Sequence, residues 1–294
     1  WKSQVSVFDL TTGAELQNYS TIADIMCIGQ MDDDPGMELA VCRPFSGRSS
    51  IIDLTTGQTE WSYNNSMGDM IQSADIDGDG KDEVIGLHHS NSIAAFDVDL
   101  QTAKWIQPIL SEGTFIVHEQ EPAEATCIYL EARGRLMCLN GADGNTLWSR
   151  EDVAHSSTEM CLADGDNDGV IELYCGTSSS SYGPGRLLVF DTITQALEWR
   201  STPIGGPFIS FDAGNIDDDP QDELVLCCED LIDDATSPYL MVFDAESLQL
   251  KTIQDVEGLQ GTIYEFADLA MVDFTPQDDN LEIILTDTDS CHGF

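Results

Sequence analysis

The chain has 294 residues, of which 54 are Asp or Glu and 11 are Lys or Arg, so its formal net charge is −43. A surface this acidic repels phosphate backbones, which excludes nucleic acid as a partner. Hydrophobic residues make up 41% of the chain, enough to predict a folded protein rather than a disordered one. No stretch reaches the roughly 18 apolar residues of a spanning helix, so no membrane insertion is expected. Trp1 begins the chain without a basic and apolar leader, and we expect any signal peptide to have been removed.

Two sequence elements alternate along the chain. One is an apolar run that ends in an anchor residue, with Trp eight residues later in four copies; the anchors are Asp9, Asp53, Asp97, Asn140, Asp191 and Asp244. The other is an acidic loop followed by a short apolar run, present as loop 1 (Gln30–Glu38), loop 2 (Asp75–Glu83), loop 4 (Asp164–Glu172) and loop 5 (Asn215–Glu223). The anchors recur every 43 to 53 residues, so six copies fill the chain.

Each copy reads as four short strands, A to D, with the acidic loop joining A to B and an Asp-Leu-Thr-Thr-Gly type of turn joining C to D. Four-stranded units at this spacing are typical of propeller blades, whereas no sustained helical period is present. The sequence therefore predicts an all-β, six-bladed β-propeller forming a single domain, residues 1–294. The expected blades are 24–62, 69–106, 114–149, 158–200, 209–252, and 266–294 completed by 1–19. The chain begins at a C strand (Gln4–Asp9) and ends just after a B strand (Glu282–Thr286), so we expect the N-terminal strands to close the last blade.

The acidic loops have the spacing of a calcium site. Oxygen side chains fall at loop positions 1, 3, 5 and 9, and position 7 is free to offer its backbone carbonyl. A tight loop of this kind suits one hard cation that prefers six to eight oxygens, and it differs from an EF-hand in placing its Glu at 9 rather than 12. The predicted ligands are Asp75, Asp77, Asp79, Lys81 and Glu83; Asp164, Asp166, Asp168, Val170 and Glu172; Asn215, Asp217, Asp219, Gln221 and Glu223; and Gln30, Asp32, Asp34, Gly36 and Glu38.

These loops resemble the FG-GAP repeats of integrin α-subunit propellers and related bacterial propellers. The resemblance implies three to four bound Ca²⁺ ions with a structural role. Weaker binding is expected at loop 1, where Gln30 replaces the leading Asp and leaves a neutral oxygen. The third copy (starting at His118) and the sixth (starting at Asp273) have lost the spacing, and no ion is expected there. The alternative is that these loops are solvated acidic turns. The occurrence of three loops with the same spacing argues against it.

The nine cysteines favour an oxidising compartment. Six of them flank turns symmetrically, which predicts three disulfides within blades: Cys27 with Cys42, Cys127 with Cys138, and Cys161 with Cys175. The alternative is that Cys fills buried strand positions as a small apolar residue. The pairing of Cys227, Cys228 and Cys291 stays open. The sequons at Asn18 and Asn64 agree with secretion and predict glycosylation, so the expected location is extracellular or on the cell surface. Halophilic adaptation would also explain the charge, but not the cysteines.

Basic residues are predicted to gather on the propeller face opposite the acidic loops. The B–C turns carry a candidate ligand face of Arg43, Arg48, Arg133, Arg135, Arg186 and Tyr182. Lys104, Arg150, Arg200 and Lys251 are assigned to the same side, as residues at the ends of D strands. Loops on a rigid scaffold often carry binding residues, so the expected partner is an extracellular protein, an acidic glycan, or another copy of the chain in a polymer. The alternative is that these side chains only solubilise the turns.

A catalytic role is not expected, and no catalytic residue is assigned. The element from Asp53 to Trp61 also resembles the docking motif of quinoprotein propellers, and the adjacent Cys227 and Cys228 invite that comparison. The motif packs blades together in non-catalytic members, and its Trp is a core residue first. The leading hypothesis is a secreted, calcium-stabilised propeller that acts in adhesion, protein interaction or the structure of an extracellular assembly. The alternative is a carbohydrate-active or quinone-dependent enzyme.

Overall fold

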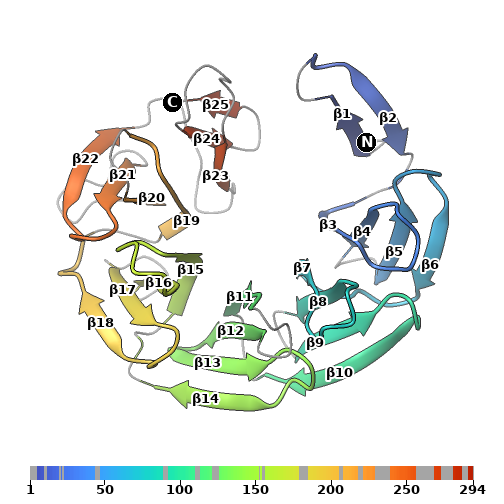
Figure 1. Ribbon diagram of the computed structural model, residues 1–294, viewed down its shortest axis with the longest axis horizontal. Coiled ribbons are helices and arrows are strands. Elements are labelled where there is room, and N and C mark those ends of the chain that lie inside the picture. Colours follow the sequence, from blue (N-terminus) through green and yellow to red (C-terminus); the bar gives the residue numbers. More distant parts are fainter. Residues whose placement is uncertain are drawn as a thin grey trace. The chain divides into compact units, whose positions relative to one another are not determined.

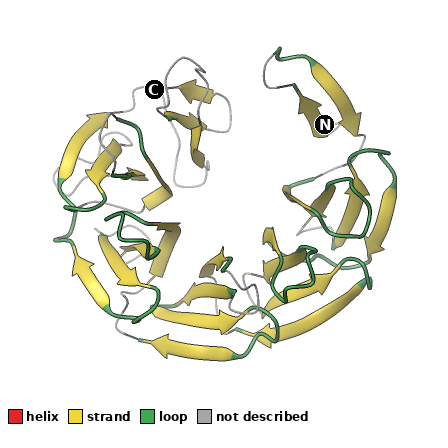
Figure 2. Ribbon diagram, in the orientation of Figure 1, coloured by secondary structure: helices red, strands yellow, loops and turns green. Residues whose placement is uncertain are grey.

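The computed structural model describes residues 5–9, 12–19, 21, 23–43, 47–88, 92–109, 113–120, 126–151, 153, 156–178, 185–204, 208–217, 221–228, 239–255, 268–272, 281–286 and 291–293. Regular structure in these residues is entirely β, as the yellow strands of Figure 2 show. Among them no helix is long and apolar enough to cross a membrane. The predicted all-β class is confirmed.

The chain divides into two compact units, Trp1–Ala132 with Leu136–Arg150, and Arg133–Arg135 with Glu151–Phe294. The sheets of the first unit run from blue to green in Figure 1. A two-stranded sheet pairs β1 (Val5–Phe8) with β2 (Glu15–Tyr19). Three antiparallel four-stranded sheets follow: blade 1 of β3 (Ile25–Gly29), β4 (Glu38–Arg43), β5 (Arg48–Asp53) and β6 (Thr59–Tyr63); blade 2 of β7 (Met70–Ala74), β8 (Glu83–His88), β9 (Ser92–Asp97) and β10 (Thr102–Pro108); and blade 3 of β11 (Gly113–His118), β12 (Cys127–Ala132), β13 (Arg135–Asn140) and β14 (Thr146–Arg150).

The second unit repeats the pattern. Blade 4 consists of β15 (Ser156–Ala163), β16 (Glu172–Ser178), β17 (Arg186–Asp191) and β18 (Leu197–Arg200), and blade 5 of β19 (Phe208–Gly214), β20 (Glu223–Cys228), β21 (Tyr239–Asp244) and β22 (Leu250–Asp255). A three-stranded sheet of β23 (Asp268–Val272), β24 (Glu282–Thr286) and β25 (Cys291–Gly293) completes it. The strand β25 pairs with β24 and was not predicted from the sequence, which was expected to end just after the strand Glu282–Thr286. Closure of this sheet by the N-terminal strands stays a prediction.

The middle strands of each blade are buried and the last strand is partly exposed. Every residue of β20 is buried, and β4, β8 and β21 are buried except at their final residue. The outer strands β10 and β14 contain only exposed and half-buried positions. Strands covered on both faces are apolar at consecutive positions, which explains why the B and C strands read as uninterrupted apolar runs.

Adjacent blades within each unit share a hydrophobic core. In the first unit, Ala40 and Ile51 of blade 1 pack with Val84 and Phe96 of blade 2. In the second unit, blades 4 and 5 share a cluster that includes Tyr174 and Phe243. Tyr19 of β2 packs against Leu39, Val41 and Ile52, so the N-terminal hairpin covers the free face of blade 1. Face-to-face burial of this kind is what binds one four-stranded sheet to the next.

The anchor residue holds the turn between the third and fourth strands. Its Oδ1 atom accepts the backbone N–H three residues later in all six copies, at 2.6 to 3.2 Å. The residue four positions after the anchor has a positive φ each time, being Gly13, Gly57, Gln101, Gly144, Gln195 and Leu248. Glycine adopts this conformation without strain, which accounts for three of the six. The turn therefore depends on the anchor side chain in all six copies and on glycine in three of them.

Candidate metal centres

The four acidic loops share one hydrogen bond to a buried glutamate. This glutamate is the first residue of the B strand, and its exposed fraction is 0 to 5%. Its Oε2 atom accepts the N–H of the residue at loop position 2 in every loop: Met31 to Glu38 at 2.5 Å, Ile76 to Glu83 at 3.3 Å, Gly165 to Glu172 at 2.9 Å, and Ile216 to Glu223 at 3.0 Å. In blades 1, 4 and 5 the glutamate also lies directly opposite the anchor Asp of the C strand. Each loop is thus folded back over a buried carboxylate.

Loop 1 gathers the largest group of carboxylates. Oxygen atoms of Asp32, Asp34 and Glu38 lie within 4.8 Å of one another, and so do those of Asp34, Asp53 and Glu60. Glu38 Oε1 and Glu60 Oε2 are buried and have no hydrogen-bond partner in the described part of the chain. Burial and the neighbouring acids raise the pKa of Glu38, and they raise that of Glu60 to about 7. Buried carboxylates that repel one another are the arrangement a divalent cation would stabilise.

Gln30 takes part in loop 1 through its amide nitrogen. Its Nε2 atom donates to the backbone carbonyls of Asp32, at 3.1 Å, and of Asp34. Its backbone N–H donates to Asp82 Oδ2 at 3.0 Å. The amide nitrogen of Gln30 therefore ties the loop together, and its role as a ligand stays a prediction.

Loop 4 places Asp164, Asp166 and Glu172 within 4.8 Å of one another. Asp164 Oδ2 accepts the N–H of Gly169 at 3.0 Å, while its Oδ1 is buried with no hydrogen-bond partner among the described residues. Burial, and then Asp166 and Glu198, raise the pKa of Glu172 to about 7. Asp168 accepts the N–H of Val170 at 2.8 Å, so this ligand candidate holds the turn in the structure.

Loop 2 contains a lysine ammonium among its carboxylates. Oxygen atoms of Asp75, Asp77 and Glu83, three of the predicted ligands, lie within 4.8 Å of one another. The Nζ atom of Lys104 lies 2.9 Å from Glu83 Oε1 and also contacts Asp77 Oδ2. Asp79 accepts the N–H of Lys81 at 2.9 Å, and the Lys81 ammonium pairs outside the group with Asp33 and Asp99.

Loop 5 has the same arrangement. Lys251 Nζ contacts Glu223 Oε1 and lies 2.9 Å from Asp217 Oδ2 and 3.8 Å from Asp244 Oδ2. The assignment of Lys104 and Lys251 to the side opposite the acidic loops is therefore wrong. Both lie near the start of the D strand, which is the end beside the C–D turn and the acidic loop. The predicted ligand Asp219 lies outside the described residues, as does Glu121 of the third copy and the stretch 273–280 of the sixth.

Sequence reasoning missed Glu60, Glu198 and the two lysines as members of the loops. All four occupy one position, seven residues after the anchors Asp53, Asp97, Asp191 and Asp244. Burial raises the pKa of Glu198, and the charges of nearby Asp166 and Asp168 raise it further. An alignment of the copies on their anchors would have shown that this position is charged in each copy that has an acidic loop, and Leu147 in the third.

The six cysteines of the predicted disulfides are thiols in the structure, in three different arrangements. Cys127 and Cys138 are hydrogen-bonded to each other, which lowers the pKa of Cys127 and raises that of Cys138. Cys27 faces Ala40 while Cys42 faces Ile25, so this pair is diagonal on one face of its hairpin.

The third pair, Cys161 and Cys175, does not lie on one face of its hairpin. Cys161 is opposite Tyr174 and Cys175 is opposite Met160, so the two cysteines are offset by one residue in the register. Because side chains alternate along a strand, the two cysteines point to opposite faces of the sheet.

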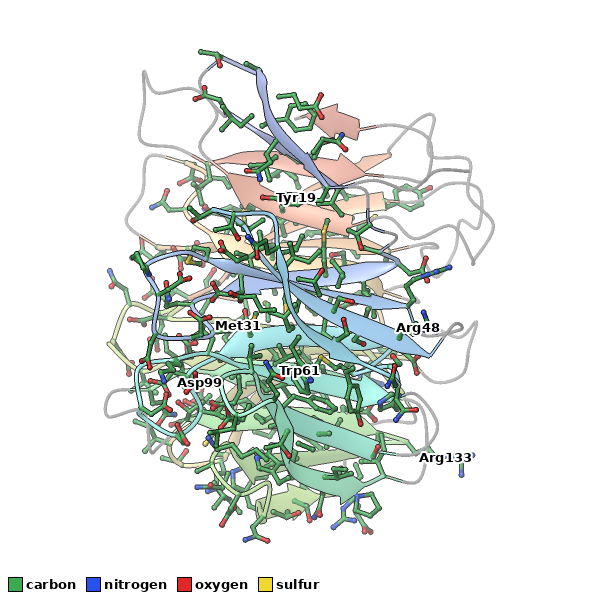
Figure 3. The ribbon with its side chains drawn as sticks, turned by 90° about the vertical axis from the view of Figure 1, so that its right-hand side faces the viewer. Tyr19, Met31, Arg48, Trp61, Asp99 and Arg133 are labelled. Carbon is green, nitrogen blue, oxygen red and sulfur yellow. The ribbon has the colours of Figure 1, made fainter. Side chains whose placement is uncertain are left out.

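The predicted surface residues lie as follows. Asn18 is exposed on β2, where its Nδ2 donates to Ser6 and Glu15, and Asn64 is exposed after β6. In the first unit, Arg48 and Asp99 lie at opposite edges of their blades, as Figure 3 shows. The remaining arginines of the candidate ligand face, Arg43, Arg133, Arg135 and Arg186, also lie at or between the ends of B and C strands, and Tyr182 lies outside the described residues.

No family model matches the chain, and no curated protein matches it. Solved structures do match. The C-terminal WD40 domain of Sif2 is 12% identical with a TM-score of 0.66, over 99% of this chain and 74% of that one. BamB from Moraxella catarrhalis is 15% identical with a TM-score of 0.57, over 96% and 77%. The computationally designed protein Ika8 is 14% identical with a TM-score of 0.58, over 100% and 90%. The chain therefore has a β-propeller fold.

Proposed function

We propose that the protein is a secreted, calcium-stabilised β-propeller that serves as an adhesion, protein-interaction or structural module of an extracellular assembly, without chemistry of its own. The observation that carries the proposal is the carboxylate group of loop 1. There Glu38 is completely buried beside two aspartates of the same loop, and one of its oxygens has no hydrogen-bond partner among the residues that the structure describes. A buried carboxylate without a partner costs several kcal/mol unless a cation offsets its charge.

Calcium fits this donor set better than a softer metal. The side chains that gather in loops 1 and 4 are carboxylates, and no Cys or His belongs to these groups among the described residues. Oxygen donors select hard cations, whereas Zn²⁺ and Cu²⁺ prefer nitrogen and sulfur. Asp32, Asp34, Glu38 and Asp164, Asp166, Glu172 would hold the ions, and the ions would neutralise part of the −43 formal charge.

The role in an assembly is supported by the fold, since a propeller presents loops on a rigid frame. The turns between B and C strands carry arginines such as Arg48, which lies at the edge away from the acidic turn at Asp99. An acidic glycan or an acidic protein surface suits such an edge. If the acidic edge of one copy bound the basic edge of another, the contact would be heterologous and would build a polymer.

The test is light scattering coupled to gel filtration, in 2 mM calcium and in excess EGTA, with thermal melting of the same samples. The proposal expects a higher melting temperature in calcium, because a ligand that binds only the folded state stabilises it by mass action. Oligomers that require calcium would support a structural polymer, and a monomer with a calcium-dependent melting temperature would favour a separate partner. Identical size and melting temperature in both buffers would contradict the calcium role.

A further inference from the structure

Two of the four acidic loops already contain a cation that belongs to the chain. In loop 2 the ammonium of Lys104 bonds the carboxylates at loop positions 3 and 9, Asp77 and Glu83. In loop 5 Lys251 bonds the same two positions, Asp217 and Glu223. These are the side chains that ligate an ion in the predicted calcium arrangement. The lysine side chains are 19% and 28% exposed, so both ammonium groups remain partly open to solvent while they bond the buried glutamates.

The hydrogen bond shared by the buried glutamates makes the comparison between loops direct. In loops 1, 2 and 5 the buried glutamate uses Oε2 for the backbone N–H, which leaves Oε1 for the interior of the loop. Oε1 of Glu83 and of Glu223 bonds a lysine ammonium. Oε1 of Glu38 is buried with no partner among the described residues. The position filled by an ammonium in loops 2 and 5 is thus the one where loop 1 lacks positive charge.

The residue seven positions after the anchor accounts for the difference. It is Lys104 in blade 2 and Lys251 in blade 5, but Glu60 in blade 1 and Glu198 in blade 4. Glu60 adds an oxygen to the group of Asp34 and Asp53. A glutamate at this position increases the negative charge around the loop, whereas a lysine supplies the positive charge that the loop needs. A divalent ion beside the ammonium would be repelled and would compete for the same oxygens.

We propose that this position decides which loops take a divalent cation: loops 1 and 4 bind calcium, with Glu60 and Glu198 as additional acidic groups, and loops 2 and 5 are neutralised by Lys104 and Lys251 and bind none. The proposal rests on the calcium role proposed above. It differs from the expectation from loop spacing, which places ions in loops 2, 4 and 5 and weaker binding at loop 1. It also lowers the expected number of ions from three or four to two.

The experiment counts calcium ions per chain by native mass spectrometry and by equilibrium dialysis against micromolar to millimolar calcium. The wild-type chain is expected to bind two ions. Four ions would overturn the lysine proposal and leave the calcium role intact, whereas no bound ion would overturn both.

Variants assign the ions to loops. Lys104→Met removes the internal cation and is expected to raise the count to three, and Glu60→Lys is expected to lower it to one. The matched control is Lys81→Met, because Lys81 belongs to loop 2 but pairs with Asp33 and Asp99 outside the carboxylate group; its count should stay at two. An unchanged count in Lys104→Met would overturn the proposal. If that variant fails to fold in EGTA, the counts of Lys251→Met and Glu60→Lys decide in its place, each with the same expected change of one ion.

Discussion

The indole Nε1 of Trp105 donates a 2.7 Å hydrogen bond to the backbone carbonyl of Gly141, joining the outer strand of blade 2 to the C–D turn of blade 3. The same ring lies against Gly144, where an added Cβ would be 2.6 Å from a ring atom. Tyr19 of the N-terminal hairpin makes a related contact with blade 1, where its hydroxyl donates to the carbonyl of Leu54 at 2.7 Å. In blade 2 the Trp of the repeated element therefore packs the blade against the turn of the next.

Trp105→Phe should destabilise the protein although the replacement remains aromatic. The carbonyl of Gly141 would lose its indole donor, and the smaller ring would leave a gap between the blades. The expected loss is about 1–3 kcal/mol in the free energy of unfolding, measured by urea denaturation. Gln107→Ala, on the same strand, is the control and should change stability little. A Phe variant as stable as the wild type would show that the hydrogen bond contributes nothing.

Gly144→Ala should cost more than Gly13→Ala, although the two glycines hold equivalent positions in their turns. Both have positive φ, +70° and +66°, so alanine suffers similar backbone strain of about 1 kcal/mol at each. A Cβ at Gly13 meets nothing within 4 Å, whereas a Cβ at Gly144 collides with the Trp105 ring. The difference between the two melting temperatures therefore isolates the contact between blades. Equal losses would mean that the ring moves aside without cost.

Glu38→Gln and Glu83→Gln should shift stability in opposite directions when calcium is absent. At pH 8 in EGTA, Glu38→Gln removes a charge that repels Asp32 and Asp34, so the melting temperature should rise. Glu83→Gln removes a buried partner of Lys104 and should lower stability by about 2 kcal/mol. Adding calcium should raise the melting temperature of the Glu83 variant but much less that of the Glu38 variant. A loss of stability in both variants in EGTA would indicate that Glu38 is not under electrostatic repulsion.

The repeat, the four-stranded units and the carboxylates that each of loops 1, 2 and 4 contributes from its own residues could be predicted because each depends on residues close together in sequence. The anchor turns are the clearest case, since the Asp side chain and the positive-φ residue lie four positions apart. The lysines could not be placed this way. Lys104 lies 21 residues from Glu83, across two strands, and its end of the blade depends on where the D strand begins. Counting from the anchor rather than from the strand end would have placed it correctly.

The cysteines illustrate the same limit. Symmetry about a turn places two residues near each other, but a one-residue offset in register moves one of them to the other face of the sheet. The pairing of β15 with β16 sets Cys161 against Tyr174, which is why the symmetric positions of Cys161 and Cys175 do not bring their side chains together. The three predicted disulfides therefore differ in how readily they can form in the folded chain.

Mild oxidation of the folded, reduced protein should join Cys127 to Cys138 first, because their thiols are already in hydrogen-bond contact and the lowered pKa of Cys127 favours its thiolate. Cys27 and Cys42 should follow slowly, since burial raises the pKa of Cys27 to about 12. Cys161 and Cys175 should stay unlinked, as their side chains leave the sheet on opposite faces. Peptide mapping by mass spectrometry without reduction measures all three, with a sample oxidised in urea as the control for what the unfolded chain can form. A Cys161–Cys175 bond in the native sample but not in the urea sample would contradict the register of β15 and β16.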